Sequence, residues 1–341
     1  MNFGTFLLMQ SPSKRPSQEI YARGLELAQA AEALGFGNIW LAEHHFSTYG
    51  YLSRPAQLAA HIAAKTTRLR VGTAVIVVPL HHPLIVAEEI ATLDVLSGGR
   101  LDVGLGRGYQ PYEFERLGLD LESGRARWDE SIDVILKALA GEPFAHDGKF
   151  FKIPETSVFP QPIQQPRPPI WVTAQSPESI EGTVRRGFNV LTGGFGDSIE
   201  RLAEFRRLFD RHVAEVKPPH PLEVGVQRAV YVAESQADAR DAAEEARWNM
   251  RVTLSLRNRY ERVERGRAIP VPAPNEPDMD DLLERFLVIG TPDTCIRQIR
   301  RIRELVGISH FNCSFWIGDL AHARVLRSME RFAREVMPAF G

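Results

Sequence analysis

Cysteine is scarce in this chain of 341 residues, where only Cys295 and Cys313 occur. Two cysteines are too few for a disulfide framework, and this pair lacks the paired spacing of a zinc site. A reducing compartment fits such a composition best, so we expect a cytoplasmic protein.

Long hydrophobic runs and an excess of charge of one sign are missing as well. No run of 18 apolar residues occurs, and the N-terminal sequence has no basic region followed by an apolar stretch, so neither a membrane span nor a signal peptide is predicted. The 41 basic and 43 acidic residues give a formal charge of −2, which provides no general attraction for nucleic acid or anionic lipid. With 44% hydrophobic and 25% charged residues, the composition is that of an ordinary globular protein.

Short apolar runs alternate with segments of helical period, which is typical of βα units around a parallel sheet. Eight runs are predicted as strands: residues 3–9, 38–42, 69–75, 101–105, 170–174, 189–192, 223–232 and 309–315. Helices are predicted after them over residues 17–35, from 55, over 83–96 and 125–139, from 177, over 198–215 and 237–256, from Thr291-Pro292, and up to 337.

Eight βα units predict an α/β TIM (β/α)8 barrel with surface insertions, formed by residues 1–341 as a single domain. An open, doubly wound sheet stays the alternative, because periodicity does not report closure. In a barrel, the functional residues lie after the C-terminal ends of the strands.

Two segments do not fit a minimal barrel. Residues 143–168 are rich in proline around the strand-like Lys149-Phe150-Phe151 and are predicted as a surface excursion. Residues 258–280 lack helical period and are predicted as a mobile lid loop. The arginines between Arg251 and Arg267 either form a solvated surface or bind an anion or a partner protein.

Histidines follow the second and third predicted strands. In Glu43-His44-His45-Phe46, either histidine is a candidate for acid–base chemistry or a hydrogen-bonded structural residue. The pair His81-His82 and the nearby Glu43 would offer metal ligands, but no second carboxylate follows in ligand spacing, so no metal is predicted.

Candidate phosphate-binding groups follow the fourth and fifth strands. The run Gly104-Leu105-Gly106-Arg107-Gly108 lacks the spacing of a dinucleotide fingerprint, but its glycines allow close approach of a flat ligand. Arg107 offers a fork for a phosphate or bridges two loops. Gln175-Ser176-Pro177-Glu178-Ser179 opens a helix, either as an ordinary cap or as an anion site.

These residues resemble a known family, the bacterial luciferase-like flavin-dependent monooxygenases, and within it the luciferase α subunit. The resemblance covers nearly the whole chain and is weak over residues 195–285. The matching motifs are Asn2-Phe3-Gly4, Gly35-Phe36, Trp40-Leu41, Glu43-His44-His45-Phe46, Val71-Gly72-Thr73-Ala74, His82-Pro83, Leu93-Asp94, Gly99-Arg100, Arg107-Gly108, Gly290-Thr291-Pro292, Gly307-Ile308-Ser309 and Val336-Met337-Pro338.

The resemblance implies a TIM barrel that binds reduced FMN, which reacts with O2 to a C4a-hydroperoxide that oxygenates a small organic substrate. His44 would be the catalytic histidine, and a non-proline cis peptide would lie at Ala74-Val75. The remaining cofactor contacts would come from the neighbouring strand ends: Gly106, Arg107, Gln175, Ser176, Ser179, Thr192 and Gly194. A separate NAD(P)H:flavin reductase would supply reduced FMN, since no nicotinamide fingerprint is present.

The chain also departs from the luciferase α subunit. Gly106 stands in place of a reactive cysteine, which implies a roomier flavin neighbourhood without that thiol, and light emission is not implied. Gln175 replaces a glutamate, and Thr192 and Gly194 replace bulky aromatics, so a long-chain aldehyde bound in the same way is not expected.

Several alternatives remain open at this point. A deazaflavin-dependent oxidoreductase shares the fold, as would a non-catalytic flavin-binding subunit, a hydrolase or a lyase. The apolar stretch 84–91 would serve a homodimer interface or simply face the barrel.

Overall fold

The computed structural model describes residues 1–341, and its centre is a closed barrel of eight parallel strands. The strands follow one another around the barrel in chain order, and the β9–β10 and β14–β1 pairings close it. The barrel strands are β1 (Asn2–Leu7), β2 (Asn38–Leu41), β3 (Arg70–Thr73), β5 (Leu101–Gly106), β8 (Ile170–Thr173), β9 (Asn189–Gly193), β10 (Val224–Val232) and β14 (His310–Ser314). The predicted TIM barrel is confirmed, and the open sheet is excluded.

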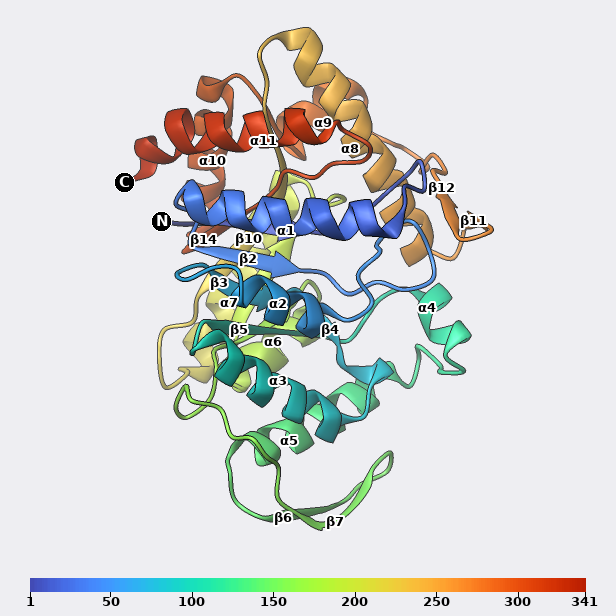
Figure 1. Ribbon diagram of the computed structural model, residues 1–341, viewed down its shortest axis with the longest axis vertical. Coiled ribbons are helices and arrows are strands. Elements are labelled where there is room, and N and C mark those ends of the chain that lie inside the picture. Colours follow the sequence, from blue (N-terminus) through green and yellow to red (C-terminus); the bar gives the residue numbers. More distant parts are fainter.

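Helices surround the barrel, as Figure 1 shows. They are α1 (Ser17–Ala33), α2 (Pro55–Ala63), α3 (Pro83–Ser97), α4 (Pro111–Arg116), α5 (Gly124–Leu139), α6 (Pro177–Arg185), α7 (Ile199–Val216), α8 (Gln236–Arg257), α9 (Met279–Arg285), α10 (Pro292–Val306) and α11 (His322–Arg331), followed by short helical turns to Phe340. None of them combines the length and apolar character that crossing a membrane requires.

Local sequence signals explain most helix boundaries. Proline occupies the first turn of α2 and α3, where its missing N–H costs no hydrogen bond. Thr291 caps α10, as predicted, by accepting from the backbone N–H of Thr294. Helix α1 begins at Ser17, as predicted, but no side chain caps its start.

Two tryptophans fill the barrel interior toward the N-terminal ends of its strands. Trp40 of β2 and Trp171 of β8 meet edge to face, with ring centroids 5.5 Å apart. A Cβ on Gly72 would lie 2.4 Å from the Trp40 ring, so only glycine leaves room for that indole. Because this part of the interior is packed, a ligand can enter only at the C-terminal ends of the strands.

The segment between α8 and α10 is more regular than its composition indicates. It contains the hairpin β11 (Arg262–Glu264) and β12 (Arg267–Ile269), then α9, then β13 (Val288–Gly290), which pairs with the end of β10. These elements were not predicted, because strands of three residues and a helix of seven are too short for a clear periodic pattern.

The proline-rich segment 143–168 also contains a hairpin, formed by β6 (Phe144–Asp147) and β7 (Lys152–Thr156). It lies far from the strand ends, at the lower edge of Figure 1. The assignment of Lys149-Phe150-Phe151 to a strand was wrong, because these residues form the connection between β6 and β7. Glu130 of α5 accepts the backbone N–H groups of all three residues.

Helix α3 buries most of the apolar stretch 84–91 against its neighbours, while Ile85 stays half-exposed. The barrel-facing alternative therefore accounts for most of this stretch. A homodimer stays a prediction.

Candidate functional site

A cavity of about 490 Å³ opens at the C-terminal ends of the barrel strands. Its wall is formed by the loops after β2, β3, β5, β8 and β9 and by the end of α8. Eight of the ten residues predicted for the site line it: His44, Ala74, Val75, Arg107, Gln175, Ser176, Ser179 and Gly194. The peptide bond between Ala74 and Val75 is cis, as the resemblance implied.

Gly106 and Thr192 lie behind the wall and do not line the cavity. A Cβ on Gly106 would lie 2.2 Å from Cγ2 of Val75, so the Val75 side chain fills the space that a larger residue would take. The expectation of a roomier pocket at this position was therefore wrong. Thr192 is buried in β9, one residue before the cavity-lining Gly193.

One end of the cavity carries the residues suited to an anion. Ser176 caps α6 and forms a capping box with Ser179, whose hydroxyl accepts the backbone N–H groups of Gln175 and Ser176 at 3.1 and 3.0 Å. Arg125 of α5 reaches the same helix start, with its guanidinium 3.5 Å from the Glu178 carbonyl. A helix start beside arginines attracts negative charge.

Arg107 adds a second cation that is not engaged within the protein. Its side chain is exposed, lines the cavity and makes neither an ion pair nor a hydrogen bond. The alternative that Arg107 bridges two loops is therefore not what the structure shows. A guanidinium with all five donors free is suited to an incoming oxyanion.

Gln175 fixes the turn after β9. Its amide donates to Asp197 Oδ2 at 2.6 Å, and Arg201 pairs with the same carboxylate at 3.2 Å. Below this turn the buried Arg228 donates to the Gly194 carbonyl at 3.3 Å, and burial lowers the pKa of its guanidinium to about 10.

His44 lies on the wall of the cavity with its ring held from one side. Its Nδ1 is 3.0 Å from Glu113 Oε1, which also accepts the His45 backbone N–H at 2.8 Å. Because a carboxylate only accepts, the Glu113 contact favours the tautomer with a hydrogen on Nδ1. The Gln110 amide nitrogen lies 3.3 Å from the same Nδ1, and Nε2 has no partner within the protein. The ring of Tyr49 packs edge to face against His44 at 4.6 Å.

Glu113 is a functional candidate that sequence reasoning missed. It lies on α4, a helix of six residues, and its side chain is only 2% exposed. Proline at the start of this helix was a boundary signal, but nothing in the sequence indicated that the segment folds back onto the loop after β2.

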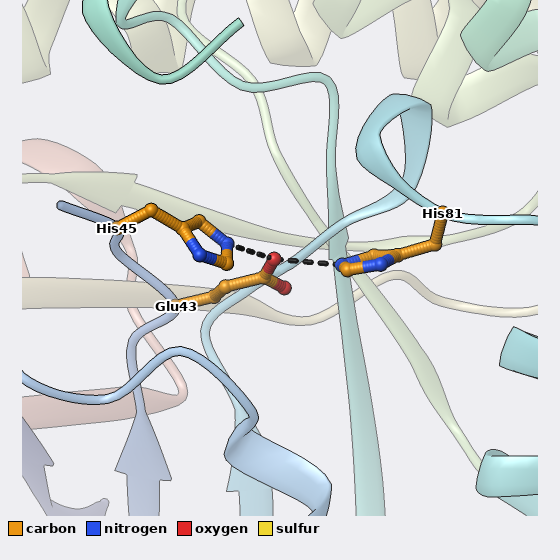
Figure 2. A group of neighbouring side chains, drawn as sticks. All are labelled: Glu43, His45 and His81. Atoms are coloured by element: carbon orange, nitrogen blue, oxygen red, sulfur yellow. Dashed lines mark hydrogen bonds and ion pairs between the residues drawn. The ribbon is translucent and has the colours of Figure 1, made fainter. Parts of the chain in front are cut away.

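A second histidine–carboxylate cluster lies at the wall, where Glu43 lines the cavity and His45 and His81 do not. Figure 2 shows His45 and His81 approaching Glu43 from opposite sides. Both Nε2 atoms contact Glu43 Oε1, at 2.8 and 2.7 Å, while Oε2 accepts the Val77 backbone N–H at 2.9 Å. Burial alone would raise the pKa of Glu43, but these hydrogen bonds lower it to about 2.

The Glu43 cluster has the donor types of a metal site, with ligand atoms within 4.8 Å of one another. Hydrogen bonds nevertheless account for all three side chains. Arg54 contacts His81 Nδ1 at 3.0 Å and brings a positive charge to the cluster, which disfavours a cation. The cluster joins the loop after β2 to the turn at β4 (Ile76–Val77), next to the cis peptide.

A chain of hydroxyl groups lines the cavity beyond His44. The Tyr49 hydroxyl lies 3.0 Å from that of Tyr109 and 2.9 Å from that of Thr253. Burial raises the pKa of both tyrosines, so both are neutral at ordinary pH. The guanidinium of Arg257 lies over the Tyr109 ring at 4.9 Å.

The segment predicted as a lid, residues 258–280, does not itself line the cavity. Its hairpin packs against the loop after β2, where the Thr48 backbone N–H donates to the Gly266 carbonyl at 2.8 Å and the Ala268 N–H donates to the Thr48 hydroxyl. On this side the cavity is lined by Thr253 and Arg257, at the end of α8.

Comparison with known proteins identifies the family. Residues 1–310 match the family model described as luciferase-like monooxygenase, and the chain belongs to this family. It is 33% identical to the oxygenase component of the flavin-dependent trigonelline monooxygenase of Acinetobacter baylyi over 352 residues, which cover 100% of this chain and 96% of that protein.

Solved structures agree with this assignment. Monooxygenase RslO1 from Streptomyces bottropensis superimposes with a TM-score of 0.88 at 28% identity, covering 100% of both chains. The oxygenating constituent of 3,6-diketocamphane monooxygenase from Pseudomonas putida, in complex with FMN, has a TM-score of 0.80 at 21% identity, over 99% and 98% of the two chains. The F420-dependent tetrahydromethanopterin reductase from Methanopyrus kandleri shares the fold. Its TM-score is 0.74 at 21% identity, covering 100% of this chain and 99% of that one.

Proposed function

We propose that the chain is an FMN-dependent monooxygenase that works as the oxygenase component of a two-component system. In this proposal, reduced FMN and O2 form a C4a-hydroperoxyflavin in the cavity, and this species oxygenates a small organic substrate. The observation that carries the proposal is that Arg107 and His44 line the same cavity, and that neither the Arg107 guanidinium nor Nε2 of His44 has a partner within the protein.

The residues present fit FMN in size and charge. A cavity of about 490 Å³ lies within the range of sites for small cofactors, roughly 300 to 1,000 Å³. The uncompensated charge of Arg107, next to the α6 start with its two serines, supplies donors for a phosphate. We assign the phosphate to Arg107, Ser176 and Ser179, and add Arg125 on the strength of its position.

The isoalloxazine ring is assigned to the middle of the cavity. There Ala74 and Val75, Gly194 and Gln175 present backbone and neutral side-chain atoms, which suit a flat, largely apolar ring. Gly106 and Thr192 lie outside the lining: Gly106 leaves room for the Val75 side chain, and Thr192 directly precedes Gly193 and Gly194 in the chain.

His44 is assigned the proton-moving role. Glu113 holds the Nδ1 hydrogen, so Nε2 faces the cavity with a lone pair that can accept a proton and return it. The neutral tyrosine pair beside it and the end of α8 line this part of the cavity, and we propose that they limit the access of water to a reactive oxygen adduct. We retain the segment 258–280 as a proposed lid, although it packs outside the cavity.

The source of electrons is assigned to another protein. The glycines after β5 lack the dinucleotide spacing, so we propose that a separate NAD(P)H:flavin reductase delivers reduced FMN.

The experiment mixes the protein and photoreduced FMN without oxygen, then adds O2 in a stopped-flow spectrometer. We expect an absorbing transient that precedes oxidised FMN and outlasts the oxidation of free reduced FMN. Oxidation at the free rate despite FMN binding would favour a non-catalytic flavin-binding subunit. Binding of a deazaflavin in place of FMN would favour a deazaflavin-dependent oxidoreductase.

A further inference from the structure

The arginines that line the cavity differ in whether a carboxylate neutralises them. Three are paired with aspartates: Arg125 with Asp129, Arg186 with Asp133 and Arg201 with Asp197, each at 3.2 Å. The other two, Arg107 and Arg257, make no ion pair and no hydrogen bond. The cavity therefore presents two uncompensated cations, and a cofactor phosphate at Arg107 leaves one of them unused.

Arg257 belongs to the His44 part of the cavity. It is the last residue of α8, and its guanidinium is stacked over the Tyr109 ring at 4.9 Å. Tyr109 hydrogen-bonds Tyr49, which packs against His44. Arg107 instead lies near the start of α5. A Cβ built on Gly124, the first residue of that helix, would be 3.9 Å from Cγ of Arg107. Contacts thus connect Arg257 to the proposed reacting end and Arg107 to the proposed phosphate end.

Stacking on Tyr109 restricts the Arg257 side chain without using any of its N–H donors. The flat fork of a guanidinium so held matches the two oxygens of a carboxylate. Phe6, Leu8 and Tyr49 supply apolar wall for an organic frame in the same cavity. One free positive charge matches a monoanion better than a dianionic phosphate, which needs more donors.

We propose that Arg257 binds the anionic group of the organic substrate and that this substrate is a small organic carboxylate. The inference rests on the proposed function, because it assigns the first anion, the cofactor phosphate, to Arg107. It also gives a specific role to one of the arginines between Arg251 and Arg267.

The test measures binding of benzoate, phenylacetate and hexanoate, each against its neutral amide, by calorimetry. Titrations are run on the protein alone and on the protein saturated with oxidised FMN. We expect at least one carboxylate to bind more tightly than its amide. Arg257→Gln should weaken the binding of that carboxylate by about tenfold or more, the usual loss for a charge-assisted hydrogen bond. Amide binding and FMN affinity stay unchanged in this variant.

The matched control is Arg262→Gln, which removes the same charge from the exposed hairpin outside the cavity. Equal losses in the two variants, or carboxylates that never bind better than their amides, would overturn the proposal. Loss of FMN affinity in Arg257→Gln would assign Arg257 to the cofactor instead. If FMN bound neither the wild type nor the variants, the proposed function would be refuted. The carboxylate titrations without FMN would still test the role of Arg257 in that case.

Discussion

At the scale of single residues, the position of His44 depends on Glu113. One carboxylate oxygen receives both the His44 ring and the His45 backbone N–H, so it fixes the ring and the hydrogen on Nδ1 together. Glu113 is therefore a positioning residue, because it acts through the His44 imidazole and is not assigned a contact with the ligand. The identity of the oxygen acceptor matters, since an amide could turn a donor toward Nδ1.

Glu113→Gln should therefore shorten the half-life of the transient formed with reduced FMN and O2 by about tenfold or more. His44→Ala should do the same while FMN affinity persists, and the double variant should be no worse than His44→Ala, because the two side chains act as one unit. Stopped-flow absorbance measures these lifetimes.

Glu115→Gln is the control, since Glu115 lies on the same helix but is exposed and paired with Arg259. Additive effects of the Glu113 and His44 replacements would refute the positioning role, as would a wild-type lifetime in Glu113→Gln.

The sequence signals available for the site were unequal. Ser176 and Arg107 were accessible to prediction because each follows a strand end and carries a donor group that few other roles explain. Glu113 was missed because α4 folds back onto the loop after β2, and no periodic pattern records such a contact. Glu43 and His81 were considered together, but the hydrogen bonds that join them to His45 were not predictable, and nothing in the sequence distinguished Arg257 from its neighbouring arginines.

At the scale of elements, the Glu43 cluster connects two loops and strand β4. Its carboxylate binds side chains from the loops after β2 and before α3 and a backbone N–H of β4, so it holds the barrel rim next to the Ala74-Val75 peptide. The pKa of about 2, against an ordinary value of 4.5, means that the ionised form is more stable in the folded chain.

The sign of the resulting pH dependence follows from this shift. The stabilisation is complete above about pH 4.5, where the unfolded chain is also ionised, and is lost as the pH falls toward 2. Glu43→Gln should therefore flatten the fall in unfolding free energy between pH 5 and pH 3, by about 2 kcal/mol.

Urea unfolding at several pH values measures this dependence. Glu204→Gln serves as control, because Glu204 is exposed on α7 and has no ion pair. Parallel curves for the wild type and Glu43→Gln would contradict the assigned role of the cluster.

At the scale of the whole molecule, the barrel could be predicted because its eight strands are short runs of four to nine residues, rich in apolar side chains, each followed by a helical pattern. Strand β13 and helix α4 were missed, because three and six residues carry too little periodicity. The shape of the cavity was not predictable either. Its wall combines strand ends with the end of α8, and Val75 occupies the space that Gly106 leaves.

The central claim is that one cavity holds FMN with its phosphate at Arg107 and the α6 start and its ring beside His44. A crystal structure of the protein grown with FMN tests this claim most directly. We predict phosphate oxygens within hydrogen-bond distance of the Arg107 guanidinium and the Ser176 hydroxyl, and the isoalloxazine ring against Ala74-Val75 with His44 Nε2 facing it. FMN bound elsewhere, or bound here with its phosphate at Arg257, would contradict the account.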